Sequence, residues 1–245
     1  MPAVSATAPG KIILFGEHAV VYGRPAIAAP VSQVRARAIL TALPREARGR
    51  VRIQAPDIGL DAWLADLPDA HPLARAVLGV FSELAVRQPP ACHVRITSTI
   101  PVAAGLGSGA AVTVAVARAL SAFLGRPLPD ERVNALAYEV EKLHHGTPSG
   151  IDNTVVTYAR PVYFVRGEPL ETLRVPVPFT IVIGDTGIPS PTATAVGDVR
   201  RAWERDPERY EELFDLTGEI AHQARQAIEV GDPEALGPLM DANHA

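Results

Sequence analysis

The chain has 245 residues, of which 47% are hydrophobic, so it can bury one large core or two smaller ones. Its formal net charge is −4 and no long run of like charges occurs, which argues against nucleic acid as a partner. A single cysteine, Cys92, excludes an internal disulfide.

The N-terminus and the apolar segments predict a cytoplasmic protein. The start, MPAVSATAPGK, lacks the basic residues and apolar stretch of a secretory signal. The longest apolar segment, Ala110 to Leu124, is too short to cross a bilayer and contains Arg118. We therefore expect no transmembrane segment and no membrane partner.

Three strands and a helix are predicted in the first 100 residues. KIILF (11–15) has the composition of a short apolar strand, and the alternation in residues 51–55 and 93–100 predicts half-buried antiparallel strands. Between these two, residues 71–87 place apolar side chains three and four positions apart, which predicts an amphipathic helix.

The middle of the chain predicts two further helices, over residues 109–123 and 129–144, and then two strands, over 161–167 and 179–187. The proline-rich stretch between these strands indicates a domain boundary. We therefore expect an N-terminal domain over residues 1–178 and a second domain over residues 179–245.

The fold class that this pattern favours is α+β, because strands precede a run of helices with no regular βαβ alternation. After Phe179 the pattern offers one strand and three amphipathic helices, whose apolar faces need a sheet to cover. We expect a C-terminal domain that is truncated; the alternative is that this region is organised differently.

A glycine-rich stretch, PVAAGLGSGAAVTVAVARAL (101–120), opens onto the second predicted helix. It matches neither the Walker A loop nor the dinucleotide fingerprint. Its glycines would let backbone N–H groups approach an anion, Ser108 adds a hydroxyl, and the helix directs its positive N-terminus to the same place. The stretch is either a phosphate-binding loop or a tight packing turn.

Two carboxylates lie around the end of the third predicted helix. Val133, Ala137 and Glu141 form one row at spacings of four, so Glu141 continues the inward face. The tight turn that follows delivers Asp152. Glu141 suits metal coordination and Asp152 suits base chemistry. The alternative is a helix end in which Asp152 is only an N-cap.

Lysine is rare in this chain: of 23 basic residues, only Lys11 and Lys142 are lysines. Arginine replaces lysine on a solvated surface but not where a compact ammonium is required. We expect Lys142, like Glu139, to point away from the inward row.

The histidines give weaker signals. His144 and His145 are adjacent and point in different directions, so we expect no metal-ligand pair there. His18 follows Glu17 where the first strand ends, a place at which polar groups often line a site.

Three blocks occur in order: APGKIILFGEHAVVYG (8–23), PVAAGLGSGAA (101–111) and EKLHHGTPSGIDN (141–153). Together they resemble the GHMP family of small-molecule kinases and, within it, the mevalonate kinases. Galactokinases are expected to have Asp-Tyr after the Gly-Glu-His, where this chain has GEHAVVYG. The segment GDTGIPSPTATAVGDV (184–199) also resembles the start of the family's C-terminal domain.

The resemblance implies ATP- and Mg²⁺-dependent phosphorylation of the C5 hydroxyl of mevalonate, in a cleft between two α+β domains. It implies Asp152 as the catalytic base, Lys11 as its cationic neighbour, and Ser108 and Glu141 as Mg²⁺ ligands. Dimers are common in the family, so a homodimer also follows from the resemblance.

Further binding residues are implied in the same way. Glu17, His18 and Thr192 would face mevalonate or the transferring group. The nucleotide phosphates would lie on the backbone of the glycine-rich loop, formed by Ala104, Gly105, Leu106, Gly107, Ser108, Gly109 and Ala110.

The chain departs from the family pattern at three places. Gly109 replaces the second serine of the family's glycine loop, so Ser108 alone would supply a hydroxyl. Ala193 follows Thr192 where the family often has lysine. The family's third glycine-rich motif does not occur before Ala245. Two alternatives stay open: a related kinase for phosphomevalonate or a similar alcohol, and a truncated, non-catalytic remnant that binds nucleotide.

Overall fold

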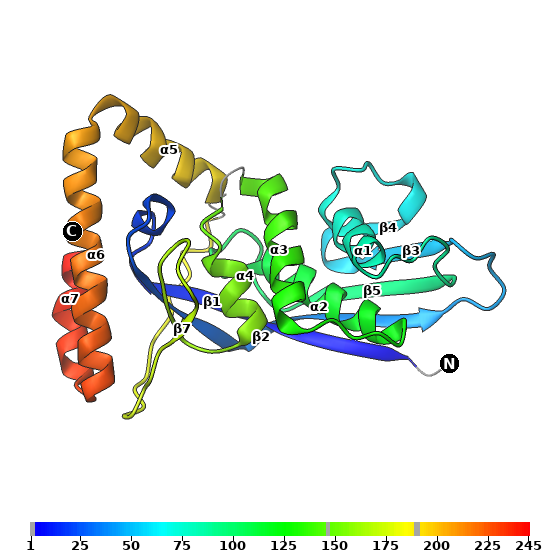
Figure 1. The fold of residues 1–245 in the computed structure, drawn as a ribbon, viewed down its shortest axis with the longest axis horizontal. Helices are drawn as coiled ribbons and strands as arrows, with labels where there is room; N and C mark the ends of the chain where they lie inside the picture. Colours follow the sequence, from blue (N-terminus) through cyan, green and yellow to red (C-terminus); the bar gives the residue numbers. More distant parts are fainter. Residues whose placement is uncertain (1–2, 146–147, 189–191) are drawn as a thin grey trace.

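The computed structural model describes residues 3–145, 148–188 and 192–245. A seven-stranded mixed sheet has the order β4-β3-β5-β2-β6-β7, and β1 pairs with β2 (Figure 1). The strands are β1 (Val4–Phe15), β2 (Ala26–Ala42), β3 (Val51–Ala55), β4 (Leu60–Trp63), β5 (Cys92–Ser98), β6 (Val162–Phe164) and β7 (Glu171–Thr172).

Among the described residues, four α-helices precede β6 and three follow β7. This arrangement confirms the α+β class. The α-helices are α1 (Pro72–Glu83), α2 (Ser108–Phe123), α3 (Asp130–His145), α4 (Ile151–Tyr158), α5 (Thr192–Arg205), α6 (Pro207–Val230) and α7 (Leu236–His244), and a short 3₁₀ helix η1 spans Ala19–Tyr22.

The long strand β2 organises the sheet. It pairs antiparallel with β1 over most of its length, with β5 near its C-terminal end and with β6 near its N-terminal end. The register of β1 shifts between Pro9 and Gly10, and such a bulge redirects the side chains that follow. The first strand begins at Val4, seven residues before the apolar KIILF part from which it is predicted.

Two buried clusters determine where the helices pack. The larger lies between the sheet and α1, α2 and α3, and α2 is buried on nearly all sides, as its run of alanine and valine requires. At the N-terminal end of β2, Ala26 and Ala28 pack with α4, whereas Ile27 between them belongs to the second cluster, with α6. This end of the sheet is thus covered on both faces.

Two of the strand predictions need correction. Strands β3 and β5 pair parallel to each other, not antiparallel, with α1 in the connection between them. Residues 179–187 form no strand. No described strand pairs with this segment, and Val182 is 91% exposed, so its apolar alternation lacks the neighbour that a strand requires.

The three helical segments predicted after Phe179 are confirmed as α5, α6 and α7. The division of the chain into domains at residues 178 and 179 stays a prediction. Within the described part of the chain, no helix has the length and apolar character needed to cross a membrane.

Candidate active site

Lys11 is held by the strand bulge and by the glycine-rich loop. Its backbone N–H donates to the Leu106 carbonyl at 3.0 Å, so β1 and the loop are joined directly. Its stem lies against Gly107, where a Cβ would be 2.7 Å from Lys11 Cγ. The ammonium lies 2.9 Å from Asp152 Oδ1 and is almost fully buried. Only glycine at position 107 leaves room for this lysine.

Asp152 lies in the first turn of α4, and its side chain is 23% exposed. The alternative that Asp152 is an N-cap is wrong, because the N-cap residue is Gly150 with φ of 92°. The carboxylate is instead turned toward Lys11. Its position at a helix N-terminus adds favourable backbone dipoles around the negative charge.

Glu141 points inward from α3, as the row with Val133 and Ala137 predicts, and is 6% exposed. It makes no ion pair or hydrogen bond with any residue that the structure describes. Burial, reinforced by the nearby charge of Asp152, raises the pKa of Glu141 to about 8, and Lys11 offsets only part of this. A buried carboxylate without a partner is the kind of group that a cation stabilises.

The glycine-rich loop presents backbone donors. Gly105 and Gly107 have φ values of 74° and 69°, a region that glycine enters at no steric cost. Gly107 is the N-cap of α2 and supplies no side-chain cap. The N–H groups of residues 104–110 donate no hydrogen bond within the described part of the chain. They surround the positive end of α2, where Ser108 is the first residue.

Two adjoining cavities meet at the carboxylates. The first has a volume of 510 Å³ and the second 480 Å³, and both are lined by Glu141, Asp152 and residues 103–106. The second is lined by residues 104–109 of the glycine-rich loop and, at an apolar end, by side chains that include Ile58, Pro72 and Val102. Sequence reasoning missed this apolar end, because the three residues are far apart in the chain.

The first cavity brings Glu17 and His18 to the side of Lys11 and Asp152. His18 has φ 62° and ψ −52°, and Ala19 N–H donates to the Glu17 carbonyl at 2.7 Å, which defines a strained γ-turn. Such a residue costs about 1–3 kcal/mol, which the surrounding structure must offset.

Another part of the wall of the first cavity comes from later in the chain, from residues 183–186, from Ile188 and from Ala195 and Val196 of α5. The sequence predicted only Thr192 from this region. The side chains of Thr192, His144 and His145 lie outside what the structure describes. The motif GDTGIPSPT indicated that this region resembles the family, but it did not indicate which of its side chains line the cavity.

The chain is similar in sequence to known kinases. Residues 72–160 match the family model of the GHMP kinases N terminal domain. A mevalonate kinase of Thermococcus sibiricus is 39% identical, and one of Thermococcus gammatolerans is 37% identical; each alignment covers 98% of this chain and 76% of the relative.

A solved structure extends the likeness to three dimensions. The mevalonate kinase of L. major, crystallised in complex with R-mevalonate, is 31% identical and superimposes with a TM-score of 0.74. The match covers 98% of this chain and 73% of that one. By sequence and by fold, this chain belongs to the mevalonate kinases of the GHMP kinase family.

Proposed function

We propose that this protein transfers the γ-phosphoryl group of ATP to the C5 hydroxyl of mevalonate. One observation carries the proposal: Asp152, paired with the buried Lys11, lines both cavities, of which one is lined by the glycine-rich loop and the other by Glu17 and His18. Phosphoryl transfer needs an acceptor and a donor that meet at such a shared residue.

Asp152 is the proposed base. It takes the proton of the attacking hydroxyl, and Lys11 beside it stabilises the negative charge that develops on the alkoxide and on the transferring group. Lys11 is fixed by β1, by the loop carbonyl and by the fit against Gly107. A charge that is fixed in place before the reaction costs no reorganisation, which strengthens its effect on the transition state.

Glu141 and Ser108 are the proposed Mg²⁺ ligands. The residues fit the ion, because Glu141 is buried without a partner among the described residues and Ser108 lines the same cavity. Magnesium prefers one or two carboxylates and keeps its remaining positions for water and phosphate oxygens. When bound, the ion would neutralise phosphate charge.

The second cavity is the proposed nucleotide site. The free N–H groups of residues 104–110 and the N-terminus of α2 suit the phosphates. The apolar end formed by Ile58, Pro72 and Val102 suits a purine base, which gains by burial of its flat faces.

The first cavity is the proposed mevalonate site. Glu17 and His18 present polar groups to it, and Val20, Ala195 and Val196 give it an apolar wall. This combination suits a short molecule with a hydroxyl at one end and a branched aliphatic middle. Thr192 is retained as a proposed contact at the start of α5.

A coupled assay of ADP release tests the proposal, with mevalonate, phosphomevalonate, galactose and homoserine supplied in parallel. We expect turnover with mevalonate well above that with the other three. Preferred turnover of phosphomevalonate would favour the related kinase, and nucleotide binding without turnover of any alcohol would favour the non-catalytic alternative.

The cytoplasmic location and the homodimer are also proposals. The first rests on the single cysteine, and the second on the family resemblance alone. Fractionation of cells and light scattering of the purified protein test them.

A further inference from the structure

The segment from Gly16 to Pro25 forms a closed loop that presents Glu17 and His18 to the first cavity. Its two ends touch: a Cβ on Gly16 would lie 2.3 Å from the Pro25 carbonyl oxygen, so only glycine fits there. Between them lies the strained γ-turn at His18. A turn of this kind keeps its shape only where neighbouring groups hold it.

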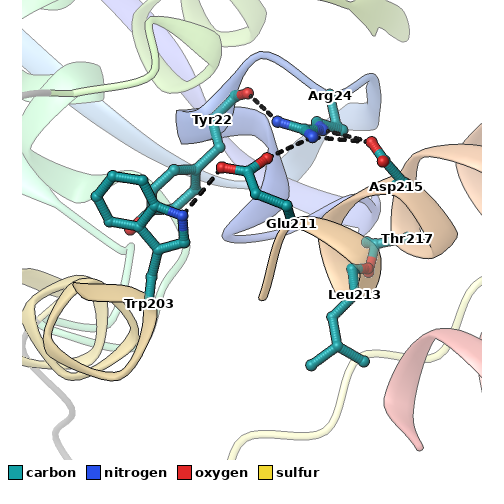
Figure 2. A network of polar contacts seen from close by, with 7 residues as sticks. All are labelled: Tyr22, Arg24, Trp203, Glu211, Leu213, Asp215 and Thr217. Carbon is teal, nitrogen blue, oxygen red and sulfur yellow. Dashed lines mark hydrogen bonds and ion pairs between the residues drawn. The ribbon is translucent and has the colours of Figure 1, made fainter. Parts of the chain in front are cut away.

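One set of neighbouring groups lies after the turn (Figure 2). Arg24 Nε donates to Asp215 at 2.9 Å, Nη2 donates to Glu211 at 2.5 Å, and Nη1 donates to the Tyr22 carbonyl at 2.9 Å. Both acids lie on α6. The planar guanidinium thereby joins the end of η1, through the Tyr22 carbonyl, to two acids of α6.

Glu211 extends the contact to α5. Its second oxygen accepts from Trp203 Nε1 at 2.9 Å, so one carboxylate joins Arg24 to α5. Tyr22 adds apolar contact, because its ring stacks on Phe214 with centroids 4.2 Å apart. Trp203 lies seven residues after Val196 and so on the same face of α5. The network therefore connects η1 and α5, which both contribute residues to the wall of the first cavity.

A second contact lies before the turn, on α7. Asn243 Oδ1 accepts the Gly16 N–H at 3.2 Å, and Asn243 Nδ2 donates to Glu17 Oε1 at 2.9 Å. One amide thus fixes both the backbone at the entry of the γ-turn and the side chain of Glu17. In Figure 1, α6 and α7 lie side by side next to this loop.

We propose that Arg24, Glu211 and Asn243 are positioning residues that hold the γ-turn at His18, and with it Glu17, in the geometry that binds the alcohol. They touch no reacting atom and act through the loop. This inference rests on the proposed function, because it assigns Glu17 and His18 to the alcohol. It predicts that the alcohol and nucleotide sites respond differently when the C-terminal helices are altered.

Three variants of the full chain test the proposal. Glu211→Gln removes the negative charge that pairs with Arg24. Asn243→Asp keeps the oxygen that accepts the Gly16 N–H but places a second negative charge beside Glu17. Asp198→Asn is the matched control: Asp198 is an exposed acid on α5 that pairs with Arg201 and makes no hydrogen bond or ion pair with the loop, all of whose residues the structure describes. Steady-state kinetics and amide hydrogen exchange are measured on each.

For Glu211→Gln and Asn243→Asp we expect the KM for mevalonate to rise about tenfold, while the KM for ATP stays within about twofold. Amide exchange in residues 16–24 should accelerate by about tenfold and that in residues 103–110 should not change. Asp198→Asn should behave as wild type in both measurements.

Unchanged exchange in residues 16–24 would overturn the proposal, and so would equal rises of both KM values. If wild-type protein failed to phosphorylate mevalonate, the proposed function would fail, yet the exchange measurement would still decide whether these residues hold the turn. A lowered melting temperature with unchanged KM and unchanged local exchange would mean a purely structural network.

Discussion

The two cavities of the site are built in different ways. The proposed nucleotide side is made inside one core: β1, the glycine-rich loop, α3 and α4 meet around Lys11, Glu141 and Asp152, which are buried or half-buried. The proposed alcohol side is lined by the loop of residues 16–25, by residues 183–186 and Ile188, and by two residues of α5. The loop is held through side-chain contacts with α6 and α7.

This difference separates two kinds of pre-organisation. On the nucleotide side, backbone geometry and close packing place the charges, so a single added methyl group at Gly107 would disturb them. On the alcohol side, polar contacts between distant segments hold a strained turn. We therefore expect substitutions on the first side to affect chemistry and nucleotide binding, and substitutions on the second to affect mainly the alcohol.

The largest effect is expected for Lys11→Met. Methionine keeps most of the packing against Gly107 but removes the charge beside Asp152, so kcat should fall by about 10³-fold. Steady-state assays with saturating substrates measure this. Lys142→Met is the matched control, since Lys142 is exposed, pairs only with Glu139 among described acids and should keep wild-type turnover. Similar losses in the two variants would argue against a special role for Lys11.

A smaller effect is expected for Gly107→Val, mainly on nucleotide binding. The new Cβ meets Lys11 Cγ at 2.7 Å, and valine is strained at φ 69°. Nucleotide affinity measured by calorimetry should fall by about 10²-fold, because both the loop and Lys11 must move.

Gly109→Ala is the control for this change. A Cβ at Gly109 meets nothing within 4 Å, so nucleotide affinity should stay within about twofold of wild type. If both glycine variants lost affinity equally, the loss would reflect general sensitivity of the loop and not the contact with Lys11.

Ser108→Ala should have a moderate effect. With Gly109 in place of a second serine, Ser108 carries the only side-chain hydroxyl of residues 104–110. The Mg²⁺ concentration needed for half-maximal rate should rise by about tenfold, with little change in melting temperature. An unchanged Mg²⁺ dependence would assign that ligand position to water.

The smallest effects are expected in the pH dependence of Mg²⁺ binding. Because the pKa of Glu141 is raised to about 8, the carboxyl is protonated at pH 7 and must release about one proton when the ion binds. Calorimetry in two buffers of different ionisation enthalpy measures this proton. Glu141→Gln should release none, and wild-type protein releasing none would contradict the assignment of Glu141.

Without Mg²⁺, the pH dependence of the free energy of unfolding should also reflect the raised pKa of Glu141. The pKa of Glu141 rises from 4.5 to about 8 on folding, so between these values the folded protein holds a proton that the unfolded chain has lost. The free energy of unfolding should therefore fall as pH rises through this range. Melting curves at pH 6 and pH 8 test this: Mg²⁺ should stabilise wild type more at pH 8, and Glu141→Gln should lack this difference.

The nucleotide side could be predicted from the sequence because its residues lie in short motifs. Helical periodicity identified the inward position of Glu141, and the glycine spacing identified a loop at the start of α2. The pairing of Lys11 with Asp152 followed only from the family resemblance, because 140 residues of chain separate them and no local pattern indicates their contact.

The alcohol side could not be predicted in the same way. Arg24, Glu211 and Asn243 form contacts across about 190 to 230 residues, and each looks like an ordinary surface residue in the sequence. The strand expected at 179–187 failed for a related reason: alternation indicates a strand only where a neighbouring strand is present to pair with it.

The most direct test of the account is a single-turnover measurement on Asp152→Asn, with ATP and mevalonate at saturating concentrations. Asparagine keeps the size of the side chain but cannot accept the proton of the hydroxyl. The chemical step should slow by about 10²- to 10⁴-fold, while the nucleotide dissociation constant stays within about twofold. A chemical step close to the wild-type rate would contradict Asp152 as the base and with it the proposed role of the Lys11–Asp152 pair.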